Sequence, residues 1–177
     1  MNPRPERSAG AAKPGSSPEA PLPIAPLAGA PLLAHIDGGA RGNPGDAGYG
    51  AHLASPAGET IAEVWGFLGT RTNNYAEYVA LLAALTYAIR SGAGGCRVRS
   101  DSELLVRQIG GSYKVRHPGL QVLHRRARLL IGKLPSFQIE HVRREQNREA
   151  DRLANRAMDD RAGSGHFPLA ELLGEGG

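Results

Sequence analysis

One segment restricts the possible folds more than any other, the run NNYAEYVALLAALTYAIRSG at residues 73–92. It has the length and spacing of an α-helix, Asn73 or Asn74 can cap its start, and Gly92 follows its end. Large apolar residues form one face, and alanines make much of the rest small or apolar. A helix with so little polar surface is buried on several sides, so the rest of the chain must supply the layers that cover it.

The segments around this helix predict a sheet. Three strands precede it, at residues 32–37, 48–55 and 59–69, and their short links are typical of an antiparallel meander. Two more strands follow it, at residues 96–102 and 137–144. Three more helices are predicted at residues 102–110, 118–134 and 147–163. The order βββαβααβα predicts an α/β (mixed α+β) domain, with helices packed on a mixed sheet.

Composition predicts one domain with two tails. The length of 177 residues suits one domain. Residues 1–30 are rich in Pro, Ala, Gly and Ser, which predicts a disordered N-terminal tail. We expect the domain at residues 31–162 and a loosely docked C-terminal tail at 163–177. The net charge of +4 fits a polyanionic partner, and it fits an ordinary basic surface equally well.

Other features indicate the compartment. The single cysteine, Cys96, excludes an intramolecular disulfide framework and a cysteine-rich zinc site. No stretch is long and apolar enough to span a membrane, and the N-terminus lacks the apolar region of a signal peptide. We therefore expect a cytoplasmic protein without a membrane partner.

Four acidic residues mark the ends of strands and the starts of helices. Asp37 and Asp101 end the first and fourth predicted strands, and Glu77 and Asp151 lie near the starts of the long helix and the last helix. An α/β fold collects functional groups at such places. Four carboxylates together would repel one another unless a counter-charge such as Mg²⁺ were present. On spacing alone, Asp101 can equally cap the next helix, and Asp151 can complement a helix dipole.

Four motifs resemble the type 1 ribonucleases H and occur in that family's order. They are IDGGARGNPGDAGYG, TNNYAEYVALLAAL, RSDSELLVRQI and EQNREADRLANRA. The resemblance covers roughly residues 32–160. It implies a ribonuclease H-like fold, with a five-stranded mixed sheet and helices on both faces. It also places the family's four acidic residues at Asp37, Glu77, Asp101 and Asp151.

The resemblance implies an endoribonuclease that cleaves the RNA strand of RNA–DNA hybrids with two Mg²⁺ or Mn²⁺ ions. Asp37 would hold both ions, Glu77 and Asp101 the ion that activates water, and Asp151 the other. The products would carry 5′-phosphate and 3′-hydroxyl ends. Two ions about 3.5–4 Å apart are a known arrangement for displacement at phosphorus.

Further segments are implied to contact the substrate. RNA differs from DNA by its 2′-hydroxyl, and in the family the GNPG turn and the TNN segment contact the minor groove, with the threonine near a DNA phosphate. The corresponding residues here are Gly42, Asn43, Thr72, Asn73 and Asn74, with Glu103 where better-studied members have Gln. Taken without the resemblance, the first segment is only a hairpin turn and the second only a helix cap.

The chain departs from many family members at the loop before the last helix. Those members have a histidine there, whereas this loop is RREQNRE. Arg144 is the candidate replacement and would contact phosphate, because arginine stays protonated. His141 lies earlier, inside the predicted strand, and is expected to be a packed or surface residue. The long basic insertion of larger members is also short here, which leaves a reduced grip to Lys114, Arg116, Arg125 and Arg126 or leaves these as ordinary surface residues.

Two alternative functions belong to other classes. The same fold could be a non-catalytic nucleic-acid-binding module, but all four carboxylates are present. It could also be a DNA-directed nuclease, which would not need the GNPG and TNN segments. We expect a monomer whose partner is an RNA–DNA hybrid duplex.

Overall fold

A computed structural model describes residues 20–175, and its sheet begins with three antiparallel strands. They are β1 (Pro31–Gly42), β2 (Gly45–Ala54) and β3 (Thr60–Arg71). A two-residue turn joins β1 to β2, since Gly42 pairs with Gly45 in the register. Gly42 has φ +99°, a left-handed conformation that glycine adopts without strain. The predicted meander is therefore confirmed, with longer strands than its sequence pattern suggested.

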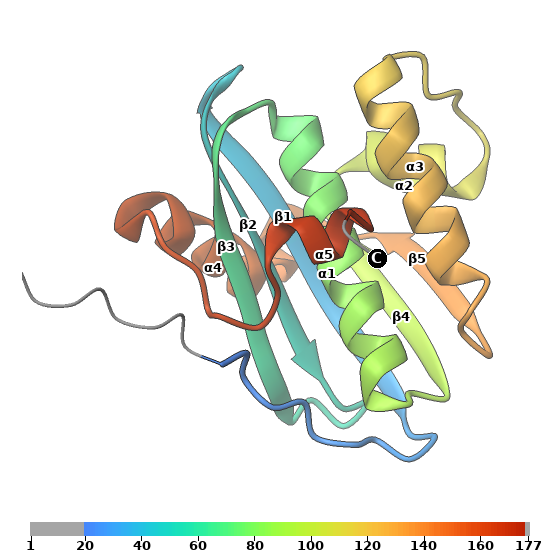
Figure 1. Cartoon of the computed structure of the whole chain (residues 1–177). Helices are drawn as coiled ribbons and strands as arrows, with labels where there is room; N and C mark the ends of the chain where they lie inside the picture. Colours follow the sequence, from blue (N-terminus) through green and yellow to red (C-terminus); the bar gives the residue numbers. More distant parts are fainter. Residues whose placement is uncertain (1–19, 176–177) are drawn as a thin grey trace, which may run out of the picture.

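The two remaining strands extend the sheet on the other side of β1. Strand β4 (Gly95–Ser100) runs parallel to β1, and β5 (Phe137–His141) runs parallel to β4. The strand order is β3-β2-β1-β4-β5. This is the predicted five-stranded mixed sheet, with β1 at its centre (Figure 1).

The helix that the sequence singled out is α1 (Asn73–Ser91). It lies across one face of the sheet and also packs against α3 (Pro118–Ile131) (Figure 1). Its buried residues come from all around the helix, as a segment without a broad polar face requires. The hydroxyl of buried Tyr78 donates a 2.7 Å hydrogen bond to Oε1 of Gln108 in α2 (Glu103–Gly110), so this polar group keeps a partner inside the core.

The opposite face of the sheet is covered by α4 (Arg148–Asp160), which packs on β1, β2 and β3 (Figure 1). Close approach depends on glycine in β2. A Cβ at Gly50 would lie 2.6 Å from the carbonyl oxygen of Ala150, and one at Gly48 would lie 2.9 Å from that of Ala154. Helices on both faces were predicted, and this is confirmed.

Two short helices lie outside the predicted order. A 3₁₀ turn, η1 (Arg144–Gln146), precedes α4, and α5 (Leu169–Leu173) follows it. Leu172 of α5 is completely buried. Residues 162–164 run along the free edge of β3, where Phe67 N donates to Ala162 O (3.0 Å) and Ser164 N donates to Trp65 O (2.9 Å). The segment after α4 is therefore docked on the domain: its backbone pairs with the edge of β3, and α5 packs on α1.

The predicted N-terminal tail falls partly outside the described residues, which exclude 1–19. Residues 20–30 lie against the domain. Leu27 N donates to Ser91 O (2.6 Å), Gly29 N donates to Gly92 O (2.8 Å), and Ile24 and Leu27 pack on the core. These apolar side chains explain why the segment contacts the domain despite its loop-like composition. The domain boundaries themselves stay a prediction.

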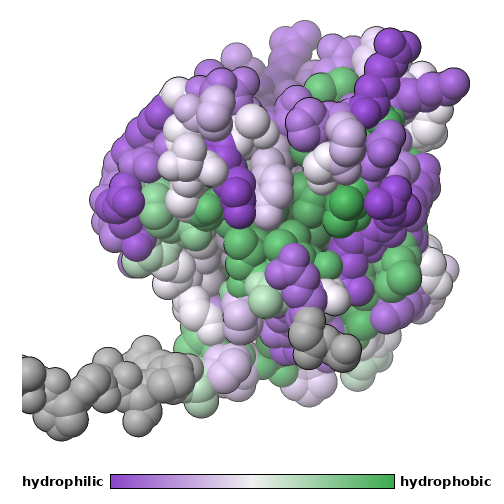
Figure 2. Space-filling view, turned by 45° about the horizontal axis from the view of Figure 1, so that its top comes forward, coloured by the Kyte–Doolittle hydropathy of each residue, from purple (hydrophilic) through white to green (hydrophobic). Residues whose placement is uncertain are grey.

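In Figure 2 hydrophilic residues cover much of the upper part of the view, and hydrophobic residues gather across its middle. Within the described range, α1 and the other helices all fall short of the length and apolar character that a membrane crossing requires.

Candidate active site

Asp37 and Asp101 are brought together by the parallel pair at the centre of the sheet. The pairing of β1 with β4 ends at Ile36 and Ser100, so the next residue of each strand is an aspartate. The sequence predicted that Asp37 ends its strand, and this is wrong. Strand β1 continues to Gly42 because it still pairs with β2 on its other side. The aspartates therefore lie where β4 stops and one edge of β1 becomes free.

Glu77 reaches the same place because α1 crosses β1 at a glycine. A Cβ at Gly38 would lie 2.2 Å from the carbonyl carbon of Ala76 and 2.3 Å from the backbone nitrogen of Glu77. No side chain larger than hydrogen fits this crossing unless the helix moves. The glycine after Asp37 therefore sets how closely Glu77 approaches the strand, and this explains the permissive sequence at that point.

Asp151 lies in the first turn of α4, which an asparagine fixes to the sheet. Asn147 is 1% exposed and donates through Nδ2 to the carbonyl oxygen of Ile36 (2.9 Å), one residue before Asp37. The backbone of Asn147 in turn accepts from the N–H of Asp151 (3.1 Å). The start of α4 and the central strand are thus joined beside the carboxylates.

The four predicted carboxylates line one cavity of about 370 Å³. The other residues of its wall come from β1, α1, η1 and α4; they are Gly38, Gly39, Ala40, Arg41, Asn73, Arg144, Ala154, Asn155 and Met158. The structure therefore brings together side chains that are spread over more than a hundred residues of sequence.

Burial and mutual repulsion raise the pKa of two of these carboxyls. The pKa of Asp37 is raised to about 8, first by burial and then by the charges of Asp101 and Asp151, with a hydrogen bond shared with Asp151. The pKa of Glu77 is raised to about 7 by burial and by Asp101, against a hydrogen bond from Ser102 that lowers it. At neutral pH the protein alone therefore holds protons at this site to reduce its negative charge.

The donor set fits hard divalent cations. All four acidic groups offer carboxylate oxygen, the ligand that Mg²⁺ prefers. Two arginines line the cavity: Arg144, whose Nη2 lies 4.0 Å from Asp151 Oδ1 and whose side chain is 81% exposed, and Arg41, which is paired with Asp159 (2.6 Å). A cation held by these oxygens would replace the protons that now lower the repulsion. Among the described residues, a group of three potential metal ligands whose atoms all lie within 4.8 Å of one another is found outside this cavity, at His52, Glu63 and Glu149. The four carboxylates of the cavity do not form such a compact group.

The two segments expected to contact the substrate lie next to each other. The side chain of Asn43, in the turn after β1, accepts from the backbone N–H of Asn73 (3.1 Å). Asn73 Oδ1 accepts from the N–H of Ala40 (2.7 Å), and the cap of α1 is Thr72, whose hydroxyl accepts from Tyr75 N (3.2 Å). The expectation that Asn73 or Asn74 caps this helix is therefore wrong, because Asn73 is used to attach the helix to β1. The Asn74 side chain is half-buried.

Three other predicted residues differ in their surroundings. Glu103 is exposed and paired with Arg107 one turn later (2.8 Å), so a substrate would have to compete for it. The cap of α2 is Ser102 rather than Asp101, which leaves the Asp101 carboxylate free for the cavity. His141 ends β5, and its Nε2 lies 3.2 Å from the backbone oxygen of Asp101. It is a surface histidine, as expected, at the edge of the site.

The basic residues of the α2–α3 connection and of α3 are only partly available for a substrate. Lys114 and Arg125 line a second cavity of about 380 Å³ with Tyr113. Arg126 instead donates to the carbonyl oxygens of Leu172 (3.2 Å) and Glu171 (3.4 Å), and so holds α5 in place.

The sequence analysis did not identify several residues that support the site. Asn147 and Gly38 position α4 and α1, and Asn155 donates through Nδ2 to the backbone oxygen of Asp151 (3.0 Å). The position of Asn147, four residues before Asp151, was the available signal. Its role depends on a contact with Ile36, which is 111 residues away and invisible in a local pattern.

Comparison with known proteins agrees with this geometry. The family model described as "Reverse transcriptase-like" matches residues 35–157. Ribonuclease HI of Halobacterium salinarum is 40% identical over 146 residues, which are 82% of this chain and 73% of that protein. The bifunctional protein Rv2228c of Mycobacterium tuberculosis is 46% identical over 134 residues, 75% of this chain. The present chain spans only 37% of that relative's length.

Solved structures give the same result. The N-terminal ribonuclease H domain of Rv2228c matches with a TM-score of 0.72 and 42% identity, over 74% of this chain and 95% of that one. RNase H1 of Halobacterium salinarum and LC11-RNase H1 in complex with an RNA/DNA hybrid each match with a TM-score of 0.71, at 42% and 38% identity, over 73% of this chain and 98% of theirs. Family model, halobacterial relative and fold all agree, and the chain therefore belongs to the ribonuclease H family, as a type 1 member.

Proposed function

We propose that this protein hydrolyses the RNA strand of RNA–DNA hybrids, using two Mg²⁺ or Mn²⁺ ions at the Asp37 cavity. The observation that carries the proposal is the gathering of four carboxylates in one cavity, whose two arginines are both exposed and one of them paired with Asp159. Such a concentration of negative charge costs folding energy unless cations offset it. The similarity to LC11-RNase H1, solved with an RNA/DNA hybrid, supports the choice of substrate.

The carboxylates have distinct places in this proposal. By the family resemblance, Asp37 would hold both ions, Glu77 and Asp101 one of them, and Asp151 the other. When bound, the ions would lower the pKa of water and stabilise charge on the attacking and leaving oxygens. By the family resemblance, water attacks phosphorus and the 3′ oxygen leaves and takes up a proton, so the products would carry 5′-phosphate and 3′-hydroxyl ends. The protein's contribution is to fix the oxygens beforehand: Gly38 lets α1 bring Glu77 close to β1, and Asn147 fixes the turn that carries Asp151.

Preference for RNA would come from the turn after β1 and the start of α1. Gly42 and Asn43 lie in the turn, and Asn73 connects it to the helix through two hydrogen bonds. A backbone without a side chain at Gly42 can approach a minor groove closely, and backbone or amide groups can recognise a 2′-hydroxyl, which DNA lacks. Thr72, Asn74 and Glu103 would contact the duplex beside this segment.

Arg144 would hold a substrate phosphate. Its guanidinium is 81% exposed and lies at the rim of the carboxylate cavity. Arginine stays charged and binds phosphate in a two-pronged geometry. We also expect the protein to be cytoplasmic and monomeric, and its location and its oligomeric state stay predictions.

The test is cleavage of three duplexes of one sequence, RNA–DNA, RNA–RNA and DNA–DNA, each with Mg²⁺ and with Mn²⁺. We expect internal cleavage of the RNA strand of the hybrid only, with 5′-phosphate ends on the products. Binding of the hybrid without cleavage in either metal would instead indicate a non-catalytic module. Cleavage of the DNA–DNA duplex at a comparable rate would indicate a DNA-directed nuclease, and either result would overturn the proposal.

A further inference from the structure

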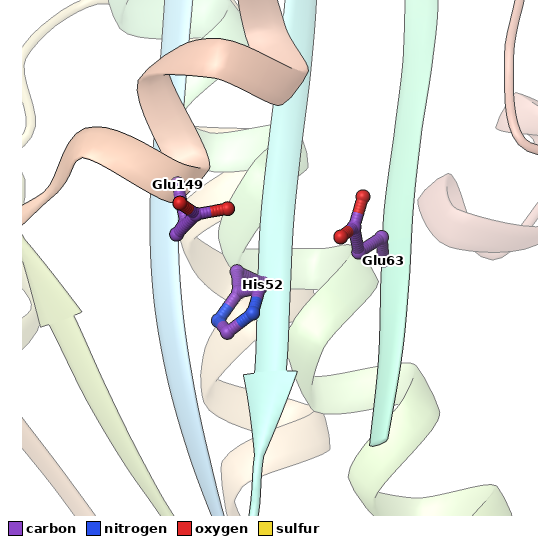
Figure 3. A group of neighbouring side chains, drawn as sticks. All are labelled: His52, Glu63 and Glu149. Carbon is purple, nitrogen blue, oxygen red and sulfur yellow. The ribbon is translucent and has the colours of Figure 1, made fainter. Parts of the chain in front are cut away.

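A second group of potential metal ligands lies on the α4 face of the sheet, apart from the Asp37 cavity. His52 of β2 and Glu63 of β3 are direct partners in the register, so their side chains leave the sheet on the same face. Glu149 comes down to them from the first turn of α4. One ligand atom from each of these three residues lies within 4.8 Å of the other two. Figure 3 shows the three side chains around one space, each from a different element.

The two carboxylates of this group already share one positive charge. Nη2 of Arg152 lies 3.0 Å from Glu63 Oε1 and 2.9 Å from Glu149 Oε2. The arginine therefore fills the place of a cation between two oxygens. Its side chain is 48% exposed, and exposed ion pairs of this kind contribute little to stability. A divalent ion could take its place while the guanidinium turns into solvent.

The histidine of the group is held in position. Nε2 of His52 lies 3.0 Å from the hydroxyl oxygen of Thr60, which limits rotation of the ring. A second histidine, His35 of β1, is the register partner of His52 on the other side. Both line a cavity of about 240 Å³ together with Glu149.

The donor chemistry differs from that of the Asp37 cavity. Histidine nitrogen and glutamate oxygen are both ligands of Zn²⁺, and three protein ligands leave the fourth position of an open zinc site free for water. Imidazole favours Zn²⁺, Co²⁺ and Ni²⁺ over Mg²⁺, which prefers oxygen alone. We propose that His52, Glu63 and Glu149 form a binding site for a divalent transition-metal ion, best suited to Zn²⁺, which the ion enters by displacing Arg152.

An ion at this site would connect β2, β3 and the first turn of α4. Glu149 is two residues from Asp151, so the same turn would carry ligands of two separate sites. Binding to the folded chain alone raises stability with ligand concentration. At a Zn²⁺ concentration of about a hundred times the dissociation constant, the melting temperature should rise by roughly 5–10 °C.

The experiment is titration of the full chain with Zn²⁺ in excess Mg²⁺, which occupies oxygen-only sites. Calorimetry gives the affinity, thermal unfolding gives the shift in melting temperature, and Co²⁺ as a probe gives visible absorption bands. We expect His52→Ala and Glu63→Gln each to weaken Zn²⁺ binding at least tenfold. The matched controls are His117→Asn, which keeps a capping side chain at the start of α3, and Glu59→Gln in an exposed turn; both should bind Zn²⁺ like the wild type.

Arg152→Gln gives an expectation of opposite sign. Because this variant removes the competing guanidinium, Zn²⁺ should bind about tenfold more tightly or better than in the wild type. Circular dichroism of each metal-free variant verifies that it is folded, and Glu63→Gln substitutes for His52→Ala if the latter fails. Equal Zn²⁺ affinity in wild type, His52→Ala and Glu63→Gln would overturn the site, and so would weaker binding in Arg152→Gln. None of these measurements depends on nuclease activity.

Discussion

The substitution Asp37→Asn should make the metal-free protein more stable, because burial, and after it the charges of Asp101 and Asp151, disfavour the ionised form of this carboxyl. The pKa of Asp37 rises from 3.8 to about 8 in the folded chain. A carboxyl with a raised pKa in the folded state subtracts stability as pH rises from its unfolded pKa to its folded pKa. The amide has no charge to lose, so the gain should be absent below pH 4 and should grow up to about pH 8.

The magnitude follows from the same shift. At pH 7 the difference between the two states spans about three pH units, which corresponds to a ceiling of about 4 kcal/mol at 1.36 kcal/mol per unit. Water in the cavity and the charges that remain on Glu77 and Asp101 reduce what the substitution can recover. We expect about 1–3 kcal/mol at pH 7, or a melting temperature higher by roughly 3–10 °C in a chain of this size.

The assay is urea and thermal unfolding of both proteins in a chelator, from acidic to weakly alkaline pH. Glu59→Gln is the matched control, since this exposed carboxyl lies in a turn away from the cavity; its effect should stay within about 0.5 kcal/mol. Saturating Mg²⁺ should stabilise the wild type more than Asp37→Asn and so reduce the difference. A variant that is less stable at every pH, or a difference that does not change with pH, would refute the argument that burial and neighbouring carboxylates destabilise the charged Asp37 side chain.

Three further predictions concern the frame of the site and its rim. Gly38→Ala places a Cβ about 2.2 Å from the backbone of α1, so it should destabilise the protein by about 1–3 kcal/mol and reduce cleavage by displacing Glu77; a neutral effect in urea unfolding would contradict the crossing. Arg144→Ala should lower kcat/KM by roughly one to two decades through loss of a charge-assisted phosphate contact, with partial recovery in Arg144→Lys; unchanged kinetics would remove Arg144 from the site. His141→Ala should have the same pH profile of cleavage as the wild type. An inflection near neutral pH that is present in the wild type and absent in His141→Ala would show that His141 transfers a proton.

Much of the fold was predictable because its signals are local. The order of strands and helices follows from apolar periodicity, caps and turns, and the four acidic residues stand out at ends of elements. Their meeting in one cavity was expected from the family resemblance, and the structure places all four there.

The rest depended on contacts between distant segments. Strand β1 runs five residues beyond Asp37 because β2 supplies its hydrogen bonds, although Gly39 and Gly42 weaken the strand pattern. The position of α5 could not be predicted, because the burial of Leu172 depends on contacts with α1, which is distant in sequence. Likewise, the pairing of His52 with Glu63 is a matter of strand register, which no motif in either segment specifies.

The most direct test of the central claim is cleavage of an RNA–DNA hybrid in Mg²⁺ by wild type and Asp37→Asn, at equal concentration and with unfolding curves showing both to be folded. The account predicts that the wild type cuts the RNA strand and that Asp37→Asn gives no product above the enzyme-free background, while Glu59→Gln cuts like the wild type. Near-normal cleavage by Asp37→Asn in Mg²⁺ would contradict the assignment of the four-carboxylate cavity as the active site.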